Sequence, residues 1–398
     1  MAACEQPAGL LETLLEQHEQ EFAEVIQGID DYQVQIYYTQ INRNVDNQPF
    51  FSSYSYNVDE NRYFYPASTV KLPIVLLTLE YLNELNINGL DMHTPMFTDR
   101  VHHWQSAALV DSTSESGVPS VAHYIKRILL VSDNEAYNRL YELLGQDYIH
   151  QKLQEKGYRN TIIVHRLEQF LDETQNKTCN PIRFEKEGKL IFRKNETIAM
   201  GDYCTKTPIV LGKGELLGNE VIGGGKDFSK KNRFPIKEMQ LMLRSIFFPE
   251  SVPYYQRFNL TAQQLNYVRK WMGALPNESK YPTYDTTQYF ESYVKFFMYG
   301  DSRQHIPSHI RIFNKIGDAY GFLIDNAYVV DYQNGIEFLL TACIYTNENR
   351  IFNDNHYEYE TIGFPFMANL GKMIYQYEKE RTKEYYPNFA HLDFYKQN

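Results

Sequence analysis

An apolar segment near the front of the chain most constrains how this protein can fold. Residues 72–79, with the sequence LPIVLLTL, would place apolar side chains on nearly every face of a helix. A helix that is apolar all round must be buried, so other elements have to surround it. Lys71 stands directly before this segment, three residues after Ser68. A lysine at the start of a buried helix loses solvation and therefore needs a specific role.

Alternating apolar residues at both ends of the chain predict a single sheet. Two alternating runs early in the sequence flank a polar turn and predict a hairpin, and three strand-like runs follow one another late in the sequence. The strands are expected over residues 32–41, 48–57, 310–321, 322–332 and 335–347. Helical spacing of apolar residues predicts helices over 9–27, 234–248, 261–275, 289–300 and 363–381.

This order of elements predicts an α+β fold, an α/β sandwich in which helices flank an antiparallel sheet, together with an all-helical lobe. We expect residues 9–65 and 235–398 to form the α/β lobe from both chain ends. Residues 66–234 would form the helical lobe, with an inserted hairpin near 180–204. A ligand cleft is expected between the two lobes.

Charge and cysteine content narrow the classes of partner. The net charge is −11 without any block of lysine and arginine, which argues against nucleic-acid binding. No run of about 18 apolar residues occurs, so no membrane-spanning helix is expected. The start, MAAC, resembles the end of a bacterial lipoprotein signal, which would tether the protein in the periplasm or cell envelope through lipidated Cys4. Cys179 and Cys204 bracket the predicted hairpin and would be bonded in an oxidising compartment but free in the cytosol.

Ser68 and Lys71 have the spacing of a nucleophile and its base. Residues three apart share one helix face, so the hydroxyl and the amine can come within hydrogen-bond distance. A serine hydroxyl needs a base to become nucleophilic, and burial can lower the pKa of a lysine enough for that task. At the start of a helix the serine N–H is also free to donate to an oxyanion. On their own, two such residues are more often a helix cap and a surface charge.

Two later groups of polar residues also point to a cleft. Ser132 and Asn134 belong to the sequence SDN, in a short connection between two predicted helices. Lys315 and Gly317 belong to the sequence NKIGD, on the first of the late strands. A lysine in an apolar strand is costly to bury unless it faces a cleft, and the glycine permits a ligand or another backbone to approach closely.

The order of these motifs resembles that of the penicillin-recognising serine hydrolases, the serine β-lactamase and DD-peptidase superfamily, and class A β-lactamases in particular. The resemblance covers roughly residues 9–381. It implies that Ser68 is acylated, that Lys71 acts as the base and that Ser132 passes a proton to the leaving nitrogen. Asn134 would hold the amide of the substrate, and Lys315 would attract its carboxylate. The N–H groups of Ser68 and Asp318 would form the oxyanion hole, and Gly317 would lie against the substrate.

The residue that removes the acyl group is less clear from the resemblance. Class A β-lactamases have a glutamate in the loop after the Ser-Asp-Asn helix, and this glutamate activates the hydrolytic water. Counting from Arg166 puts that position on Leu171. Glu168, Asp172 and Glu173 are the nearby acids. Either one of them activates the water after a shift in register, or all three are solvated loop residues.

The site for the substrate carboxylate also departs from the family. Ile316 stands where the family has threonine or serine, which removes one hydroxyl donor. Asp318 places an acid beside the expected oxyanion hole. The following strand, residues 321–330, contains no arginine that would replace the missing donor.

Three functions are therefore open. The favoured one is a serine hydrolase that cleaves β-lactams through an acyl-enzyme on Ser68. The second is a penicillin-binding DD-peptidase or esterase-like enzyme with impaired deacylation, and the third is a non-catalytic binding protein on the same scaffold. The substrate would be a small molecule or a peptidoglycan peptide. No cofactor is expected, and the His102–His103 pair lacks a third ligand, so no metal site is expected.

Overall fold

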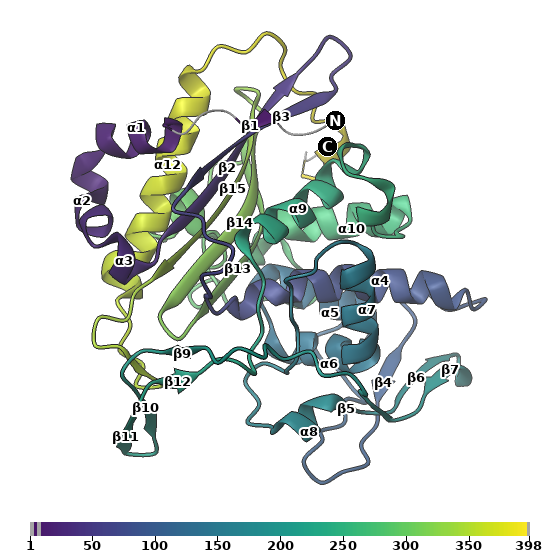
Figure 1. The fold of residues 1–398 in the computed structure, drawn as a ribbon. Helices are drawn as coiled ribbons and strands as arrows, with labels where there is room; N and C mark the ends of the chain where they lie inside the picture. The colour runs from purple at the N-terminus through teal and green to yellow at the C-terminus, as the bar shows by residue number, and fades with distance from the viewer. Residues whose placement is uncertain (1–3, 6–8, 396–398) are drawn as a thin grey trace.

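The computed structural model describes residues 4–5 and 9–395 and contains one main sheet (Figure 1). Its strands lie in the order β1-β3-β2-β15-β14-β13, and all neighbours are antiparallel except β1 with β3. The bounds are β1 Cys4–Glu5, β2 Gln35–Arg43, β3 Pro49–Tyr56, β13 Ile310–Ala319, β14 Phe322–Asp331 and β15 Ile336–Tyr345. The two ends of the chain meet where β2 pairs with β15, with Tyr38 opposite Leu340.

Helices cover both faces of this sheet because both faces are apolar. Every residue of β14 and β15 is buried, as is usual for strands between two helical layers. On one side lie α1 Leu10–Gln17, α2 Glu19–Gln27, α3 Ile29–Tyr32 and α12 Phe364–Glu380. On the other side lie α9 Ile236–Phe247 and α10 Ala262–Gly273 (Figure 1). The α+β fold predicted from the alternating runs is confirmed.

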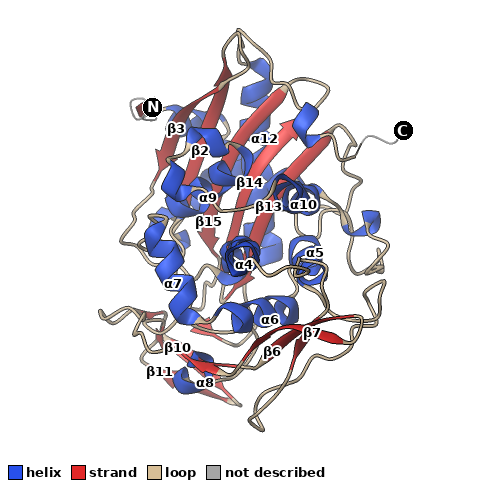
Figure 2. Cartoon of the chain, turned by 90° about the vertical axis from the view of Figure 1, so that its right-hand side faces the viewer, coloured by secondary structure: helices blue, strands red, loops and turns tan. Residues whose placement is uncertain are grey.

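The apolar helix predicted from residues 72–79 is α4, Lys71–Leu85, and other helices surround it (Figure 2). It contacts α5 Val121–Val131, α6 Asn134–Leu144 and α7 Gln146–Glu155. All residues from 71 to 80 are buried. One hydrophobic core contains α4 and α9 together, so it continues from the helical lobe to the sheet. The division into lobes at residues 66 and 235 stays a prediction.

Short strands extend the helical lobe at its outer edge. β4, β6 and β7 form a three-stranded sheet in the order β4-β6-β7, and β6 and β7 are a hairpin that turns at Glu187 and Gly188. The remaining bounds are β4 Met96–Thr98, α8 Glu173–Lys177, β5 Thr178–Cys179, β6 Ile182–Lys186, β7 Lys189–Lys194, β8 Thr197–Ile198, β9 Val210–Leu211, β10 Gly214–Leu217, β11 Glu220–Gly223, β12 Lys226–Asp227 and β16 Ile351–Phe352.

The helix predicted over residues 289–300 is wrong. This segment forms turns and only one short helix, α11 Phe296–Tyr299, whose interior backbone angles are not helical throughout. The N–H groups of Phe296 and Phe297 donate to the buried carboxylate of Asp325, at 3.2 and 3.3 Å. The carbonyl of Val294 accepts from Nδ2 of Asn314 at 2.7 Å. Side chains of the sheet therefore take up backbone groups that a helix would have paired internally.

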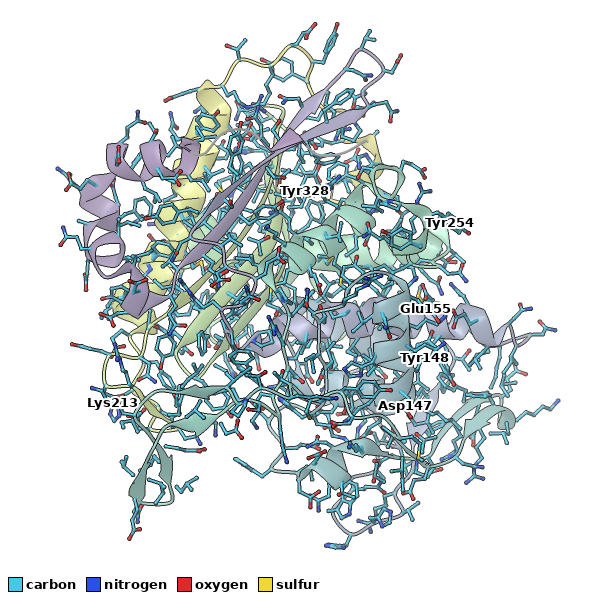
Figure 3. All side chains as sticks on the ribbon, in the orientation of Figure 1. Asp147, Tyr148, Glu155, Lys213, Tyr254 and Tyr328 are labelled. Carbon is cyan, nitrogen blue, oxygen red and sulfur yellow. The ribbon has the colours of Figure 1, made fainter. Side chains whose placement is uncertain are left out.

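Side chains fill the space between the layers (Figure 3). Tyr328 of β14 packs against the rings of Phe247 and Phe248, with centroid distances of 4.8 and 5.3 Å. Its buried hydroxyl donates to Oε2 of Glu337 at 2.6 Å, so this polar group keeps a partner inside the core. Within residues 4–5 and 9–395, no helix has the length and apolar character needed to cross a membrane.

Candidate active site

Ser68 lies in a tight turn at the entrance to the buried helix α4. The turn is a short 3-10 helix, Ala67–Val70, and α4 follows it directly. Ala67 has a φ of 46°, a conformation that is strained for a residue with a Cβ. Such strain persists only where the surrounding packing enforces it, and it is common at functional sites. The turn leaves Ser68 half-buried at the edge of a pocket.

Lys71 is buried directly behind Ser68. Its Nζ lies 2.8 Å from Oγ of Ser68, 3.1 Å from Oγ of Ser132 and 2.5 Å from Oδ1 of Asn134. It also contacts the carbonyl oxygen of Ser132. Burial lowers the pKa of Lys71 to about 7, and the charges of Asp133, Asp318 and Glu168 oppose this shift. A neutral amine within hydrogen-bond distance of a serine hydroxyl can accept its proton.

Ser132 and Asn134 reach the same point from the connection between α5 and α6. Ser132 ends α5 with a φ of 60°, and Asp133 begins α6 by accepting a hydrogen bond from the N–H of Ala136 at 2.8 Å. Arg127 pairs with Asp133 at 2.8 Å and fixes the connection further. The left-handed residue reverses the chain between the two helices, so both polar side chains face Ser68 instead of solvent.

Lys315 approaches Ser132 from the sheet. Its Nζ lies 2.8 Å from Oγ of Ser132 and 2.9 Å from the carbonyl oxygen of Ile316. Burial lowers the pKa of Lys315 well below its usual value, and the nearby charge of Lys71 lowers it further. Ser132 therefore lies between two amines, one from the helical lobe and one from the sheet, as a proton relay requires.

Gly317 allows strand β13 to lie against the turn that carries Ser68. A Cβ at this position would come within 2.6 Å of the carbonyl oxygen of Pro66 and 3.0 Å of the Ser68 nitrogen. The hairpin from β13 to β14 turns at Tyr320 and Gly321, so Ala319 and Phe322 form its closing hydrogen-bonded pair.

The next pair along this hairpin, Asp318 with Leu323, is then a non-hydrogen-bonded pair. Because β13 is the last strand of the sheet, the N–H of Asp318 points away from the other strands. Together with the N–H of Ser68, it is available to stabilise an oxyanion.

Of the three predicted deacylation acids, Glu168 alone lines the pocket. It stands at a φ of 53°, in a loop held by two hydrogen bonds of 2.9 Å between Asn138 and the backbone of Leu167. Asp172 is the N-cap of α8, and Glu173 is paired with Lys177 and Lys230 on the surface. Leu171, the position reached by counting from Arg166, is not among the residues that line the pocket, so among these loop residues Glu168 is the acid that shares the pocket with Ser68.

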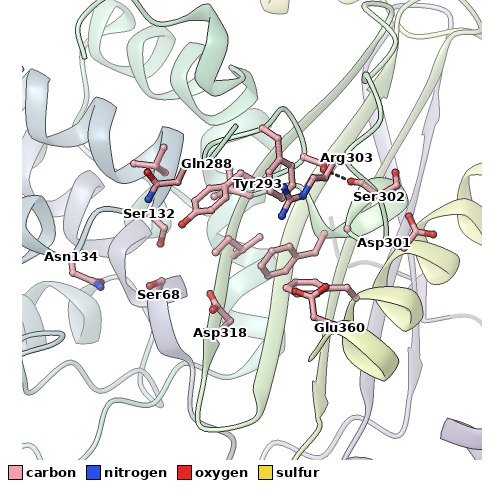
Figure 4. A pocket seen from close by; sticks show the side chains of 18 of the residues that line it. Ser68, Ser132, Asn134, Gln288, Tyr293, Asp301, Ser302, Arg303, Asp318 and Glu360 are labelled. Carbon is pink, nitrogen blue, oxygen red and sulfur yellow. Dashed lines mark hydrogen bonds between the residues drawn. The ribbon is translucent and has the colours of Figure 1, made fainter. Parts of the chain in front are cut away.

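A pocket of about 620 Å³ extends from these residues across the edge of β13 (Figure 4). Ser68, Ser132 and Asn134 lie at one end, Asp301 and Glu360 lie at the other, and Asp318 lies between them. Burial raises the pKa of Asp318 to about 6, although its side chain is open to the pocket.

Sequence reasoning missed the outer wall of this pocket. Residues 288–303 supply much of it, Phe364 is the first residue of α12, and Glu360 lies in the π-helical turn Tyr359–Gly363 just before it. The wall contains Arg303, whose guanidinium lies 4.7 Å above the ring of Phe290. A helix was expected over most of this segment, so its side chains could not be placed. Residues 285–299 contain no glycine, so the sequence did not mark this segment as irregular. The irregular backbone depends on hydrogen bonds with Asp325 and Asn314, which are distant in the sequence.

Other residues noted in the sequence lie outside this site. Cys179 and Cys204 are free thiols in the structure, and His102 lies 3.0 Å from Glu196 on the surface. Within the described part of the chain, one group has ligand atoms close enough together for a metal, namely Glu173, Asp202 and Cys204. The Glu173 carboxylate is already shared by two lysines, so we assign this group no role. The side chain of Cys4 lies outside the described part of the structure.

Comparisons with known proteins agree with this geometry. A family model described as the beta-lactamase enzyme family matches residues 17–190, which include Ser68, Lys71, Ser132 and Asn134. No curated protein sequence matches the chain.

Among solved structures, the acyl-enzyme complex of a PBP-A variant with penicillin G has a TM-score of 0.50 and 16% identity. That match covers 94% of this chain and 100% of the other. A β-lactamase from Burkholderia phymatum has a TM-score of 0.47 and 13% identity over 92% of this chain and 97% of its own. The PBP-A likeness shows the fold, and the family match accounts for the first two motifs. Over residues 17–190 this chain is therefore similar to the beta-lactamase enzyme family, and its fold is that of PBP-A.

Proposed function

We propose that this protein is a serine hydrolase that forms an acyl-enzyme on Ser68 and hydrolyses β-lactams. The observation that carries the proposal is the contact of 2.8 Å between Ser68 Oγ and the buried Lys71 Nζ, whose pKa burial lowers to about 7. A binding protein would have no need to bury an amine behind a serine hydroxyl, because this burial is costly.

The acylation step uses residues already in contact. Neutral Lys71 takes the hydroxyl proton of Ser68, and Oγ attacks the carbonyl carbon of the substrate. The N–H groups of Ser68 and Asp318 stabilise the resulting oxyanion. When the C–N bond breaks, the hydroxyl of Ser132 gives its proton to the leaving nitrogen and regains one from Lys71, which lies 3.1 Å away. The product is an ester between Ser68 and the acyl group.

Deacylation requires a water molecule and a second base. In this proposal Glu168, which lines the pocket beside Ser68, accepts the proton of the water as the water attacks the ester carbon. As the ester C–O bond breaks, the proton taken up by Glu168 passes to Oγ of Ser68, and the acyl group leaves as a carboxylic acid. If Glu168 does not act in this way, the protein is a penicillin-binding enzyme with a long-lived acyl-enzyme, which is the second candidate function. The departures at Ile316 and Asp318 weaken the recognition of a substrate carboxylate in both candidates and do not distinguish between them.

Intact-mass measurement tests the proposal. The wild-type protein is incubated with benzylpenicillin and with ampicillin, and a mass increase equal to the antibiotic is expected within the first turnover. Ser68→Ala should show no adduct. Loss of the adduct with time and release of the opened product would support hydrolysis, and a lasting adduct would support the second candidate. Absence of any adduct on the wild-type protein would refute both.

The location in the cell envelope and the lipid tether at Cys4 are part of this proposal. Metabolic labelling with a fatty acid, with Cys4→Ala as control, tests the tether. Label on the variant, or no label on the wild type, would refute it.

A further inference from the structure

The pocket next to Ser68 contains more negative charge than its neighbours neutralise. Four carboxylates line it, from Glu168, Asp301, Asp318 and Glu360. Asp301 is neutralised by Lys372, whose Nζ lies 2.6 Å from its Oδ2. The carboxylates of Glu168, Asp318 and Glu360 form no hydrogen bond or salt bridge with any residue in the described part of the chain. They come from three separate elements, namely the loop before α8, strand β13 and the turn before α12.

Positive charge in the pocket is limited to one exposed group. Arg303 is the only arginine or lysine among the described residues that line it, and its guanidinium lies over Phe290. Lys71 and Lys315 lie behind the wall, fully buried, where burial favours their neutral forms. One guanidinium therefore faces three unpaired carboxylates. A substrate whose only charged group is a carboxylate could pair with Arg303. It would, however, add negative charge to a pocket that already contains three unpaired carboxylates.

The rest of the lining also suits a positive group better than a negative one. Ile316 offers no hydroxyl donor to an anion. The rings of Tyr293, Phe296 and Phe364 line the pocket, and ring faces attract ammonium groups. Burial raises the pKa of Tyr293, and the charges of Asp318 and Glu168 raise it further, so the ring stays neutral.

From this juxtaposition of three unpaired carboxylates, aromatic rings and a reactive serine, we propose that the preferred acyl donor carries a primary ammonium group. The ammonium group binds between Asp318 and Glu360, and a carboxylate on the same substrate pairs with Arg303. This inference rests on the proposed function, because it names the substrate class of the same site.

Matched substrates that differ in one amine test the inference. Ampicillin differs from benzylpenicillin only by an ammonium group on its side chain. The peptide N-acetyl-L-lysyl-D-alanyl-D-alanine differs in charge from its Nε-acetylated form. The second-order rate of Ser68 acylation is measured for all four by quenched-flow mass spectrometry at neutral pH. In at least one pair, the ammonium form should react on the order of tenfold faster, and the ratio should fall as salt is raised.

Two variants identify the groups responsible. Asp318→Asn and Glu360→Gln should each bring the ratio within a pair closer to one, because each removes a charge and keeps the size of the side chain. Asp301→Asn is the matched control, since Lys372 already neutralises that carboxylate, and it should leave the ratio unchanged.

The outcomes separate the two proposals. Acylation by both members of each pair at equal rates would overturn the inference and leave the proposed function intact. The inference would also be overturned if the ratio of acylation rates between the ammonium form and its uncharged partner stayed unchanged in both Asp318→Asn and Glu360→Gln. No acylation of Ser68 by any of the four compounds would refute the proposed function and the inference together.

Discussion

The reacting centre and the outer pocket satisfy their polar groups in opposite ways. Lys71, Ser132 and Lys315 are held by one another at 2.8–3.1 Å and are fixed by elements of the hydrophobic core. In the outer pocket, Asp318, Glu360 and Arg303 are open to solvent, and none of them has a hydrogen-bond or salt-bridge partner among the described residues. Under the proposed function, this difference assigns the chemistry to the core and the choice of substrate to loops that can change without disturbing the core.

The largest expected effect comes from the reacting centre. Lys71→Met should reduce the acylation rate on the order of a thousandfold or more, because Ser68 loses its base. The same change should raise the melting temperature, since an apolar side chain replaces a buried amine whose desolvation is costly. Rapid-quench mass spectrometry and thermal unfolding measure the two effects. Acylation at near the wild-type rate would show that another group takes the Ser68 proton.

A second prediction separates acylation from deacylation. Glu168→Gln should slow release of the acyl group on the order of a hundredfold while acylation stays nearly unchanged, because an amide cannot accept the proton of the water. The adduct should therefore accumulate in the mass spectrum. Glu173→Gln is the matched control, since this acid pairs with surface lysines outside the pocket. Equal effects of the two substitutions would contradict the role of Glu168.

The pH dependence of acylation should follow Lys71. Only the neutral amine can accept a proton, and its pKa is about 7, so acidification protonates the base and slows the reaction. Acylation should fall about tenfold per pH unit well below this value, and roughly fiftyfold between pH 7 and pH 5. Single-turnover rates over this range measure the profile. A rate that is flat down to pH 5 would mean that the base titrates at a much lower pH.

Gly317→Ala tests how closely the sheet must approach Ser68. The new Cβ would meet backbone atoms of Pro66 and Ser68, so β13 has to move and the oxyanion donors shift. We expect acylation to fall on the order of tenfold, which is less than the loss of a whole donor. Gly223→Ala is the matched control, because nothing lies within 4 Å of its Cβ position and its φ is ordinary. Equal rates for Gly317→Ala and wild type would show that β13 does not contribute to the oxyanion site.

The same contrast explains what could be predicted from sequence. The strands β13 to β15 and the buried helix α4 follow from local apolar patterns. The short motifs lie at the entrance to α4 (Ser68 and Lys71), between α5 and α6 (Ser132) and on β13 (Lys315). The spacing of apolar residues predicts a helix or strand correctly where the segment packs as a regular helix or strand.

The outer pocket depends on contacts between distant residues, and sequence reasoning failed there. The segment 289–300 has apolar residues compatible with a helix, but Asp325 and Asn314 hold it in an irregular form. Arg303 and Glu360 are 57 residues apart and share a pocket only through tertiary packing. Glu168 was named as a candidate, yet counting could not decide between it and its neighbours, because the loop conformation directs its side chain.

The smallest expected effect comes from Asp325, where the reacting centre and the outer pocket meet. Asp325 is fully buried, and it holds the pocket wall by accepting hydrogen bonds from the N–H groups of Phe296 and Phe297. Burial raises its pKa to about 6, and the nearby amine of Lys295 opposes the shift. Asp325→Asn should raise the substrate concentration for half-maximal acylation a few-fold and leave the limiting rate unchanged, because the wall loosens while Ser68 and Lys71 stay in place.

Asp331→Asn separates this effect from a general loss of stability. Asp331 lies at the other end of β14, where it accepts hydrogen bonds from Asn334 and Tyr375 away from the pocket. Both substitutions should lower the free energy of unfolding by about 1–3 kcal/mol, since each weakens a set of hydrogen bonds to a buried carboxylate. Only Asp325→Asn should change the concentration dependence of acylation. If Asp325→Asn instead lowers the limiting rate, the wall contributes to the chemistry, and the division between a fixed centre and an adjustable pocket is wrong.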